Sequence, residues 1–176
     1  MRPRWLDALR RGWMLYHLAD PHFAFMYDAP PSGEWVALDC ETTGLNVRHD
    51  RIVSIGAVRI VGNRLLTSQR LELLVRPDRS VTPDSVRVHH LRERDVAQGM
   101  NVEEAVRRLL DFIGCRPLVG CYLEFDVAML NREIWPLLGV RLPQRKIEVS
   151  AMYYDFKNRS CRQPGAAATS TCAWPR

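Results

Sequence analysis

The pattern of apolar and polar positions predicts three strands between residues 35 and 77. The run 35–40, WVALDC, is short and apolar, which is typical of a buried strand. Two longer runs, 51–62 and 65–77, are rich in β-branched residues. The sequence Gly-Asn-Arg at 62–64 joins them with the chemistry of a tight hairpin. We therefore expect an antiparallel meander.

Helical and strand patterns alternate in the rest of the chain. Thr82 followed by Pro83 predicts the start of a short helix within residues 80–91. The clearest helical pattern spans 101–114, where Asn101 is the expected cap. The remaining expected elements are a strand at 117–122, a helix at 124–139 and a strand that passes into a helix at 146–156. This order predicts an α/β fold, with a mixed sheet of three antiparallel and two parallel strands flanked by helices.

The two ends of the chain differ from this central pattern. Residues 1–33 form an expected appendage, which the Pro- and Gly-containing stretch 28–33 separates from a main domain at 34–159. Its helical apolar positions are Trp5, Leu9, Trp13 and Tyr16. We expect this helix to pack on its own domain, in preference to binding a membrane or a partner. Residues 160–176 lack periodicity and predict an irregular tail.

Composition narrows the class of protein only modestly. The net charge of +5 and pI near 9.2 suit a polyanionic partner without specifying one. None of the five cysteines stands at C-x-x-C spacing, which argues against a zinc ribbon or a secreted disulfide framework. We expect reduced thiols and a cytoplasmic location. No apolar run reaches the length of a membrane span, so we expect no contact with a membrane.

Three acidic residues follow the predicted strands and are candidates for a metal site. Asp39 and Glu41 lie on one side of their strand if it stays extended, and Asp126 stands just past the 117–122 strand. If these strands are neighbours, the three carboxylates converge, and their repulsion favours a hard cation such as Mg²⁺ or Mn²⁺. Each acid also has an ordinary structural explanation, as part of a solvated turn or as a complement to a helix dipole.

Three segments in the same order resemble the DEDD-type 3′–5′ exonucleases, the superfamily of the proofreading epsilon subunit of bacterial DNA polymerase III and of ribonuclease T. Residues 39–45, DCETTGL, resemble the first family motif. Residues 86–96, VRVHHLRERDV, are similar to its V-H-G-I-x-D-x-x-V segment. Residues 119–130, VGCYLEFDVAML, look like the second motif with its Phe-Asp pair. Order and spacing agree from about residue 35 to 158.

The resemblance implies a ribonuclease H-like fold and two-metal hydrolysis of a terminal phosphodiester, with Mg²⁺ or Mn²⁺ as the cofactor. Asp39 would bridge both ions, Glu41 would bind the ion that carries the attacking water, and Asp126 would hold the other ion. The substrate pocket implied for the terminal nucleotide consists of the Thr42–Thr43 backbone, Phe125 and the region of His89.

The chain departs from the family pattern in two places. The third motif, H-x-A-x-x-D, is absent: no His follows His90, so no general base is found, and Asp155 is the only Asp after Asp126. Cys121 and Tyr122 replace the usual His-Asn before the Phe-Asp pair. We expect a domain truncated before its last helix and impaired in activity, and translation of the other two frames beyond codon 160 tests this.

The sequence leaves two classes of function open. The first is a 3′–5′ exonuclease of DNA replication, proofreading or repair, which acts on single-stranded or frayed 3′ ends beside a possible DNA polymerase subunit. Trimming of RNA in the manner of ribonuclease T is a variant of it. The second is a catalytically inactive remnant that binds nucleic acid or docks on a partner. The three carboxylates favour the enzyme, whereas the absent third motif favours the remnant.

Overall fold

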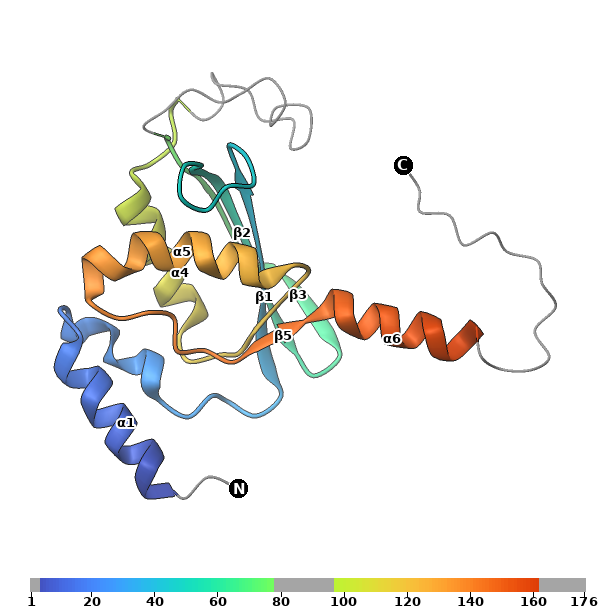
Figure 1. Cartoon of the computed structure of the whole chain (residues 1–176), viewed down its shortest axis with the longest axis horizontal. Coiled ribbons are helices and arrows are strands. Elements are labelled where there is room, and N and C mark those ends of the chain that lie inside the picture. The colour runs from blue at the N-terminus through green and yellow to red at the C-terminus, as the bar shows by residue number, and fades with distance from the viewer. Residues whose placement is uncertain (1–3, 78–96, 162–176) are drawn as a thin grey trace.

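The computed structural model describes residues 4–77 and 97–161, and in them a five-stranded sheet has the order β3-β2-β1-β4-β5 (Figure 1). The strands are β1 (Glu34–Thr42), β2 (Ile52–Val61), β3 (Arg64–Leu74), β4 (Leu118–Gly120) and β5 (Lys146–Glu148). The first three strands are antiparallel, and β4 and β5 are parallel to β1. The predicted mixed sheet is therefore confirmed.

The strand patterns are explained by one buried face of the sheet. In β1 the residues Val36, Leu38 and Cys40 are buried, whereas the side chains between them are more exposed. The β2–β3 hairpin turns at Gly62, whose φ of +56° lies in the left-handed region that favours glycine. The pairing places Ala37 opposite Val58 and Asp39 opposite Gly56, so these positions share the other face.

Two helices, α4 (Val102–Ile113) and α5 (Leu123–Leu138), contribute most of the helical core. The Asn101 side chain accepts a hydrogen bond from the Glu103 N–H and so caps α4, as the sequence predicts. Helix α4 ends at Gly114, which has a φ of +60°. Fully buried residues of the two helices that join the core include Leu109, Leu110, Ile113, Met129, Leu130 and Ile134.

The N-terminal region packs on this core through residues that the helical pattern did not select. Helix α1 (Arg4–His17) leads into a 3₁₀ helix, η1 (Pro21–Tyr27), whose Phe23 and Met26 are buried in the common core. Trp13 and Tyr16, two members of the predicted apolar face, are instead 65% and 85% exposed. The predicted packing face of α1 was therefore wrong, because Met14 and Leu15 make the contact with the core.

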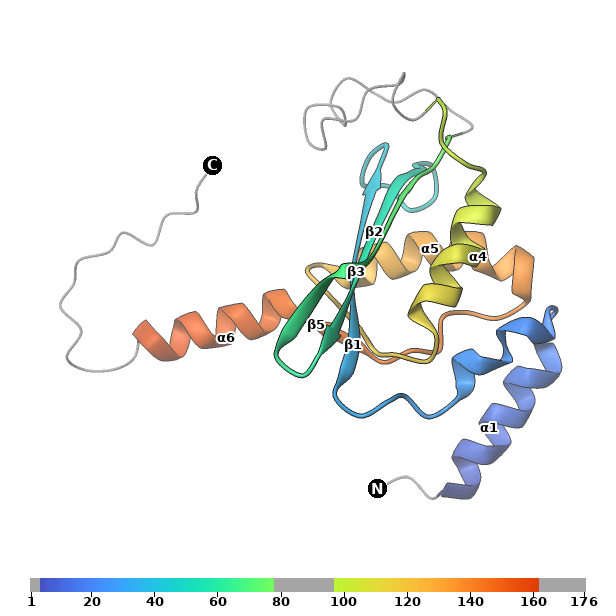
Figure 2. The ribbon, with the colours of Figure 1, turned by 180° about the vertical axis from the view of Figure 1, so that it is seen from behind.

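Helix α6 (Val149–Cys161) continues directly from β5 and projects away from the rest of the molecule (Figures 1 and 2). The expected passage from a strand into a helix is thus confirmed. The short helix predicted within residues 80–91 lies outside the described residues. Among the helices that the structure describes, none is both long and apolar enough to cross a membrane.

Candidate active site

The carboxyl end of β1 supplies the first two carboxylates. Strand β1 pairs with β4 only at Val36 and Ala37, so its last residues extend beyond the end of β4. Alternation along β1 sends Asp39 and Glu41 to the same side, where Asp39 is exposed and Glu41 is half-buried. The intervening Cys40 points to the core.

The third carboxylate comes from the first turn of α5, where Asp126 is only 4% exposed. Burial and the nearby negative charge of Asp39 raise its pKa to about 7, and Glu41 and Glu148 contribute in the same direction. A hydrogen bond from the Cys40 backbone N–H opposes the rise. The charges of Asp39 and Glu41 therefore act on Asp126, and the role of the three acids in a metal site stays a prediction.

Glu148, at the end of β5, holds the start of α5 in place. Tyr122 precedes this helix with a φ of +55° and makes no side-chain cap. Instead, the Glu148 carboxylate accepts hydrogen bonds from the backbone N–H of Tyr122 at 2.8 Å and of Leu123 at 2.9 Å. It also accepts from the N–H and hydroxyl of Ser150. These bonds outweigh the desolvation that opposes ionisation, and they lower the pKa of Glu148.

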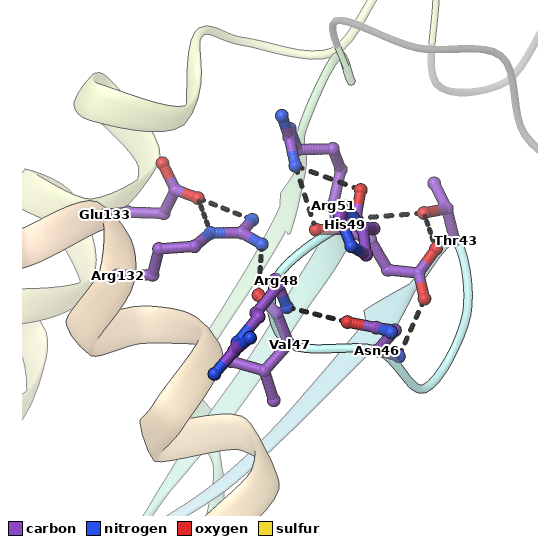
Figure 3. Close-up of polar contacts among 9 residues, drawn as sticks. Thr43, Asn46, Val47, Arg48, His49, Arg51, Arg132 and Glu133 are labelled. Carbon is purple, nitrogen blue, oxygen red and sulfur yellow. Dashed lines mark hydrogen bonds and ion pairs between the residues drawn. The ribbon is translucent and has the colours of Figure 1, made fainter.

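The loop that follows β1 is closed by the carboxylate of Asp50. It accepts hydrogen bonds from the Thr43 hydroxyl at 3.1 Å and from the Asn46 N–H at 2.7 Å, and the Thr43 hydroxyl accepts in turn from the Arg51 N–H (Figure 3). A Cβ added to Gly44 would lie 2.6 Å from an Asp50 carboxylate oxygen. A side chain at position 44 would therefore displace the Asp50 carboxylate from the hydrogen bonds that close the loop after Glu41.

Arg132 connects the same loop to α5. Its guanidinium donates to the Val47 carbonyl and pairs with Glu133 at 2.7 Å (Figure 3). Both side chains of the ion pair are largely buried. This contact fixes the distance between the loop after β1 and the helix that carries Asp126.

The residues predicted to contact substrate lie in different environments. Thr42 and Thr43 are buried, and their hydroxyls donate to the Gly44 carbonyl and to Asp50. Phe125 is half-buried and packs against the core cluster. His89 lies outside the described residues. None of these positions is tested as a substrate contact, so their roles stay predictions.

The donor chemistry of the site fits a hard divalent cation, although its ligands are not closely grouped. Asp39, Glu41 and Asp126 offer carboxylate oxygens, and their repulsion leaves a charge that a cation would neutralise. Among residues 4–77 and 97–161, no three His, Cys, Asp or Glu side chains are arranged so that they could hold a metal ion. Binding would therefore require the carboxylates to move closer together.

Glu148 and Asp50 contribute to this region although the sequence pattern did not single them out. Glu148 carried the same signal as Asp39, an acid at the end of a predicted strand. Asp50 carried a weaker signal, because an acid four residues after Asn46 in a polar loop is typical of many turns. Their importance depends on backbone N–H groups that only the tertiary structure brings to them.

Comparison with known proteins identifies the class. The family model for exonucleases (RNase T type) matches residues 36–162, and the chain belongs to this family. It resembles the epsilon subunit of DNA polymerase III. That of Treponema pallidum is 34% identical over 118 residues, which cover 67% of this chain and 54% of the relative. The epsilon subunit of Escherichia coli K12 is 31% identical over 103 residues, which cover 56% of this chain and 42% of the relative. The chain thus spans about half the length of these relatives.

Solved structures agree on the fold. The zinc-bound form of the Escherichia coli exonuclease I complex with single-stranded DNA matches 74% of this chain and 31% of that chain, with a TM-score of 0.64 and 14% identity. A product-bound exonuclease I matches with a TM-score of 0.61 and 15% identity, over 74% and 33% of the two chains. The sheet is therefore ribonuclease H-like, as expected.

Proposed function

We propose that the chain is a 3′–5′ exonuclease domain that hydrolyses terminal phosphodiesters of DNA with the help of divalent cations. The observation that carries the proposal is that the negative charges of Asp39 and Glu41 act on Asp126, whose pKa burial and these charges together raise to about 7. Such accumulated negative charge costs stability in a metal-free protein and becomes favourable when cations bind. Membership of the exonuclease family supports the reaction type.

The residues have distinct tasks in this proposal. Asp39 and Glu41 would hold cations from the exposed side of β1, and Asp126, once ionised, would complete the site from α5. When bound, two divalent cations polarise the terminal phosphate and lower the pKa of the attacking water. Glu148 and Arg132 maintain the position of α5, and Asp50 maintains the loop after β1.

The proposed substrate is the 3′ end of single-stranded or frayed DNA, with a DNA polymerase subunit as a possible partner. The relatives support this choice: several are polymerase subunits, and solved neighbours include exonuclease I complexes with single-stranded DNA. RNA trimming is the alternative substrate class.

Release of mononucleotides from a 3′-labelled single strand tests the proposal. Mn²⁺ should support release, EDTA should abolish it, and Asp39→Ala should lower it at least about 100-fold. Arg48→Ala is a matched control, because this exposed loop side chain lies near the site without belonging to it. Equal activity in Asp39→Ala and the unmodified chain would refute the assignment. A labelled RNA strand of the same sequence distinguishes the substrate classes.

The second candidate is a non-catalytic domain that binds nucleic acid. One observation favours it: the described residues contain no closely grouped metal ligands. It predicts retention of single-stranded DNA on the protein without release of nucleotides, and with equal affinity in Mn²⁺ and EDTA. A rise in Tm with Mn²⁺ that is lost in Asp39→Ala would instead show that the carboxylates bind metal.

A further inference from the structure

A pocket with a volume of about 1040 Å³ lies at the end of the sheet where the parallel strands begin. We call it the end pocket. Most of its lining comes from the segments 27–30, 115–117 and 141–145, which precede β1, β4 and β5. Arg11 of α1 and Trp135 of α5 also line it. The end pocket is therefore separate from the acids of the candidate active site, which follow the carboxyl ends of β1 and β4.

The walls of the end pocket come from well-defined parts of the fold. Shortly before and after residues 78–96, Val75 and Met100 pair with one another at the edge of the sheet where β1 ends, which is the opposite edge. Residues 162–176 follow α6, which begins at the carboxyl end of β5 and leads away from the sheet (Figures 1 and 2). The pocket is thus built by strand entries and by the N-terminal region that packs on them.

The polar lining of the end pocket has an excess of positive charge. Among the described residues that line it, Asp28 is the only acid, and it pairs with Arg11 at 2.9 Å. Arg141 and Arg145 have no carboxylate partner in the part of the chain that the structure describes. Arg141 instead lies over the Trp135 ring, 5.7 Å from its centre. Two guanidinium groups therefore remain for an anionic ligand, and their planar donors suit a phosphate.

The amide of Gln144 adds a buried hydrogen-bond acceptor to this wall. Gln144 is 5% exposed, and its Nε2 donates to the Gly114 carbonyl at 2.8 Å. Because a carbonyl can only accept, Gly114 fixes which end of the amide is the donor. The other end, Oε1, is buried and has no hydrogen-bond partner among the described residues. Buried acceptors are normally paired, so this oxygen favours a ligand that carries an N–H or O–H group.

Aromatic side chains beside these polar groups indicate a planar ligand. Trp135 is 55% exposed and Tyr27 is half-buried, and both line the end pocket. Aromatic faces next to arginines are typical of sites that stack a base and hold its phosphate. A planar ring with an N–H donor and an attached anion uses the aromatic, amide and cationic parts of the lining together. A nucleotide has this composition.

We propose that the end pocket binds a nucleotide. Its phosphate lies at Arg141 and Arg145, its base stacks on Trp135, and an N–H of the base donates to the oxygen of Gln144. A free nucleotide and a nucleotide within a single strand share this chemistry. The site stands apart from the proposed hydrolysis, because it uses none of the three carboxylates and needs no divalent cation.

Equilibrium binding of dAMP to the full chain in EDTA tests the proposal. Arg141→Ala and Arg145→Ala should each raise the Kd of dAMP about tenfold, because each removes a charge-assisted contact to the phosphate. Arg64→Ala, at an exposed position of β3, removes the same charge elsewhere and should leave the Kd unchanged. Asp39→Ala should also leave it unchanged, which separates the end pocket from the candidate active site. Equal Kd values in Arg145→Ala and Arg64→Ala would overturn the proposal, as would a lack of binding.

Other ligands and a fourth variant separate the parts of the pocket. Deoxyadenosine lacks the phosphate, so its weaker binding should not respond to Arg145→Ala. Gln144→Leu should raise the Kd of dAMP and leave that of inorganic phosphate unchanged, and the arginine variants decide the question if this one loses cooperative unfolding. Inorganic phosphate that binds as tightly as dAMP would show a general anion site and refute nucleotide recognition.

A short oligodeoxyadenylate distinguishes the two sources of the nucleotide. If it binds more tightly than dAMP and Arg145→Ala weakens it, the end pocket takes a nucleotide of a single strand. If dAMP binds more tightly and Arg145→Ala weakens dAMP, the pocket takes a free nucleotide. Both results support the site, whereas oligonucleotide and dAMP binding that are both insensitive to Arg141→Ala and Arg145→Ala would contradict it.

Discussion

Ionisation of the Asp126 carboxyl group makes the stability of this fold depend on pH. Its folded pKa of about 7 lies above the ordinary value of 3.8, so the folded state binds its proton more tightly than the unfolded state. In the absence of metal, ionisation of Asp126 lowers the free energy of unfolding. This effect is absent below about pH 4, grows as the pH rises and is complete above about pH 7. Cations that bind its ionised form should remove part of this effect.

Asp126→Asn should therefore be more stable than the unmodified chain at pH 8 in EDTA, by up to about 4 kcal/mol, and the difference should shrink towards pH 4. Urea unfolding at a series of pH values measures it. Mn²⁺ at pH 8 should raise the Tm of the unmodified chain more than that of the variant. A stability difference that does not change with pH would contradict the assigned pKa.

Asp50 exerts its effect through the loop after β1. Asp50→Ala removes the acceptor used by the Thr43 hydroxyl and the Asn46 N–H, so we expect a loss of about 1–3 kcal/mol in the free energy of unfolding. Arg48→Ala, in the same loop, should change it by no more than about 0.5 kcal/mol. Denaturant titration compares the two variants. Equal stability of both would show that Asp50 does not close the loop.

At the scale of elements, Glu148 joins β5, α5 and α6. Glu148→Ala leaves the first N–H groups of α5 without their acceptor, which should lower the free energy of unfolding by about 1–3 kcal/mol. It should also reduce stabilisation by Mn²⁺, because Asp126 lies in the first turn of α5. Glu124→Ala removes an exposed acid from the same turn and is the control for charge alone.

A smaller Mn²⁺ effect in Glu148→Ala together with an unchanged one in Glu124→Ala would support a positioning role for Glu148. If both variants lose the Mn²⁺ effect equally, the cause is the lost negative charge near the site and not the capping of α5. Hydrogen exchange at the Tyr122 and Leu123 amides gives an independent readout, since only loss of the cap should accelerate it.

The sequence predicts elements well where one face of a strand or helix is buried. The three strands of the meander were located to within a few residues, because burial of Val36, Leu38 and Cys40 imposes a period of two. The capped helix α4 was equally clear from Asn101 and its apolar face. Helix α1 shows the limit of this reasoning. The spacing of Trp13 and Tyr16 defines an apolar stripe, but it does not say whether anything covers it.

The residues of the candidate site also fall into those that the sequence pattern indicates and those that it does not. Asp39, Glu41 and Asp126 could be proposed from the sequence, because each follows a predicted strand, and their charges do influence one another in the fold. Glu148 and Asp50 could not be assigned, because each acts on backbone groups of another segment. Pairing across the fold depends on the register and the loop path, neither of which is encoded by local periodicity.

For the whole molecule, the packing of η1 places part of the N-terminal region in the core. Phe23 is 1% exposed, and the Arg107 guanidinium lies 5.6 Å from its ring centre. Arg107 also pairs with Asp20 at 2.8 Å, which ties the residue before η1 to α4. Residues 18–27 therefore contribute to the stability of the sheet domain, whereas the outer face of α1 does not.

Phe23→Ala should lower the free energy of unfolding by about 3–5 kcal/mol, the usual effect of deleting a buried aromatic ring. Trp13→Ala should change it by no more than about 0.5 kcal/mol, since that ring is 65% exposed. Denaturant unfolding of both variants gives the comparison, and a single transition monitored by two probes would show that η1 and the sheet unfold together. A small effect in Phe23→Ala, or a separate early transition, would instead make the first 33 residues an independent unit. The N-terminal region thus allows the boundary of the cooperative domain to be measured directly.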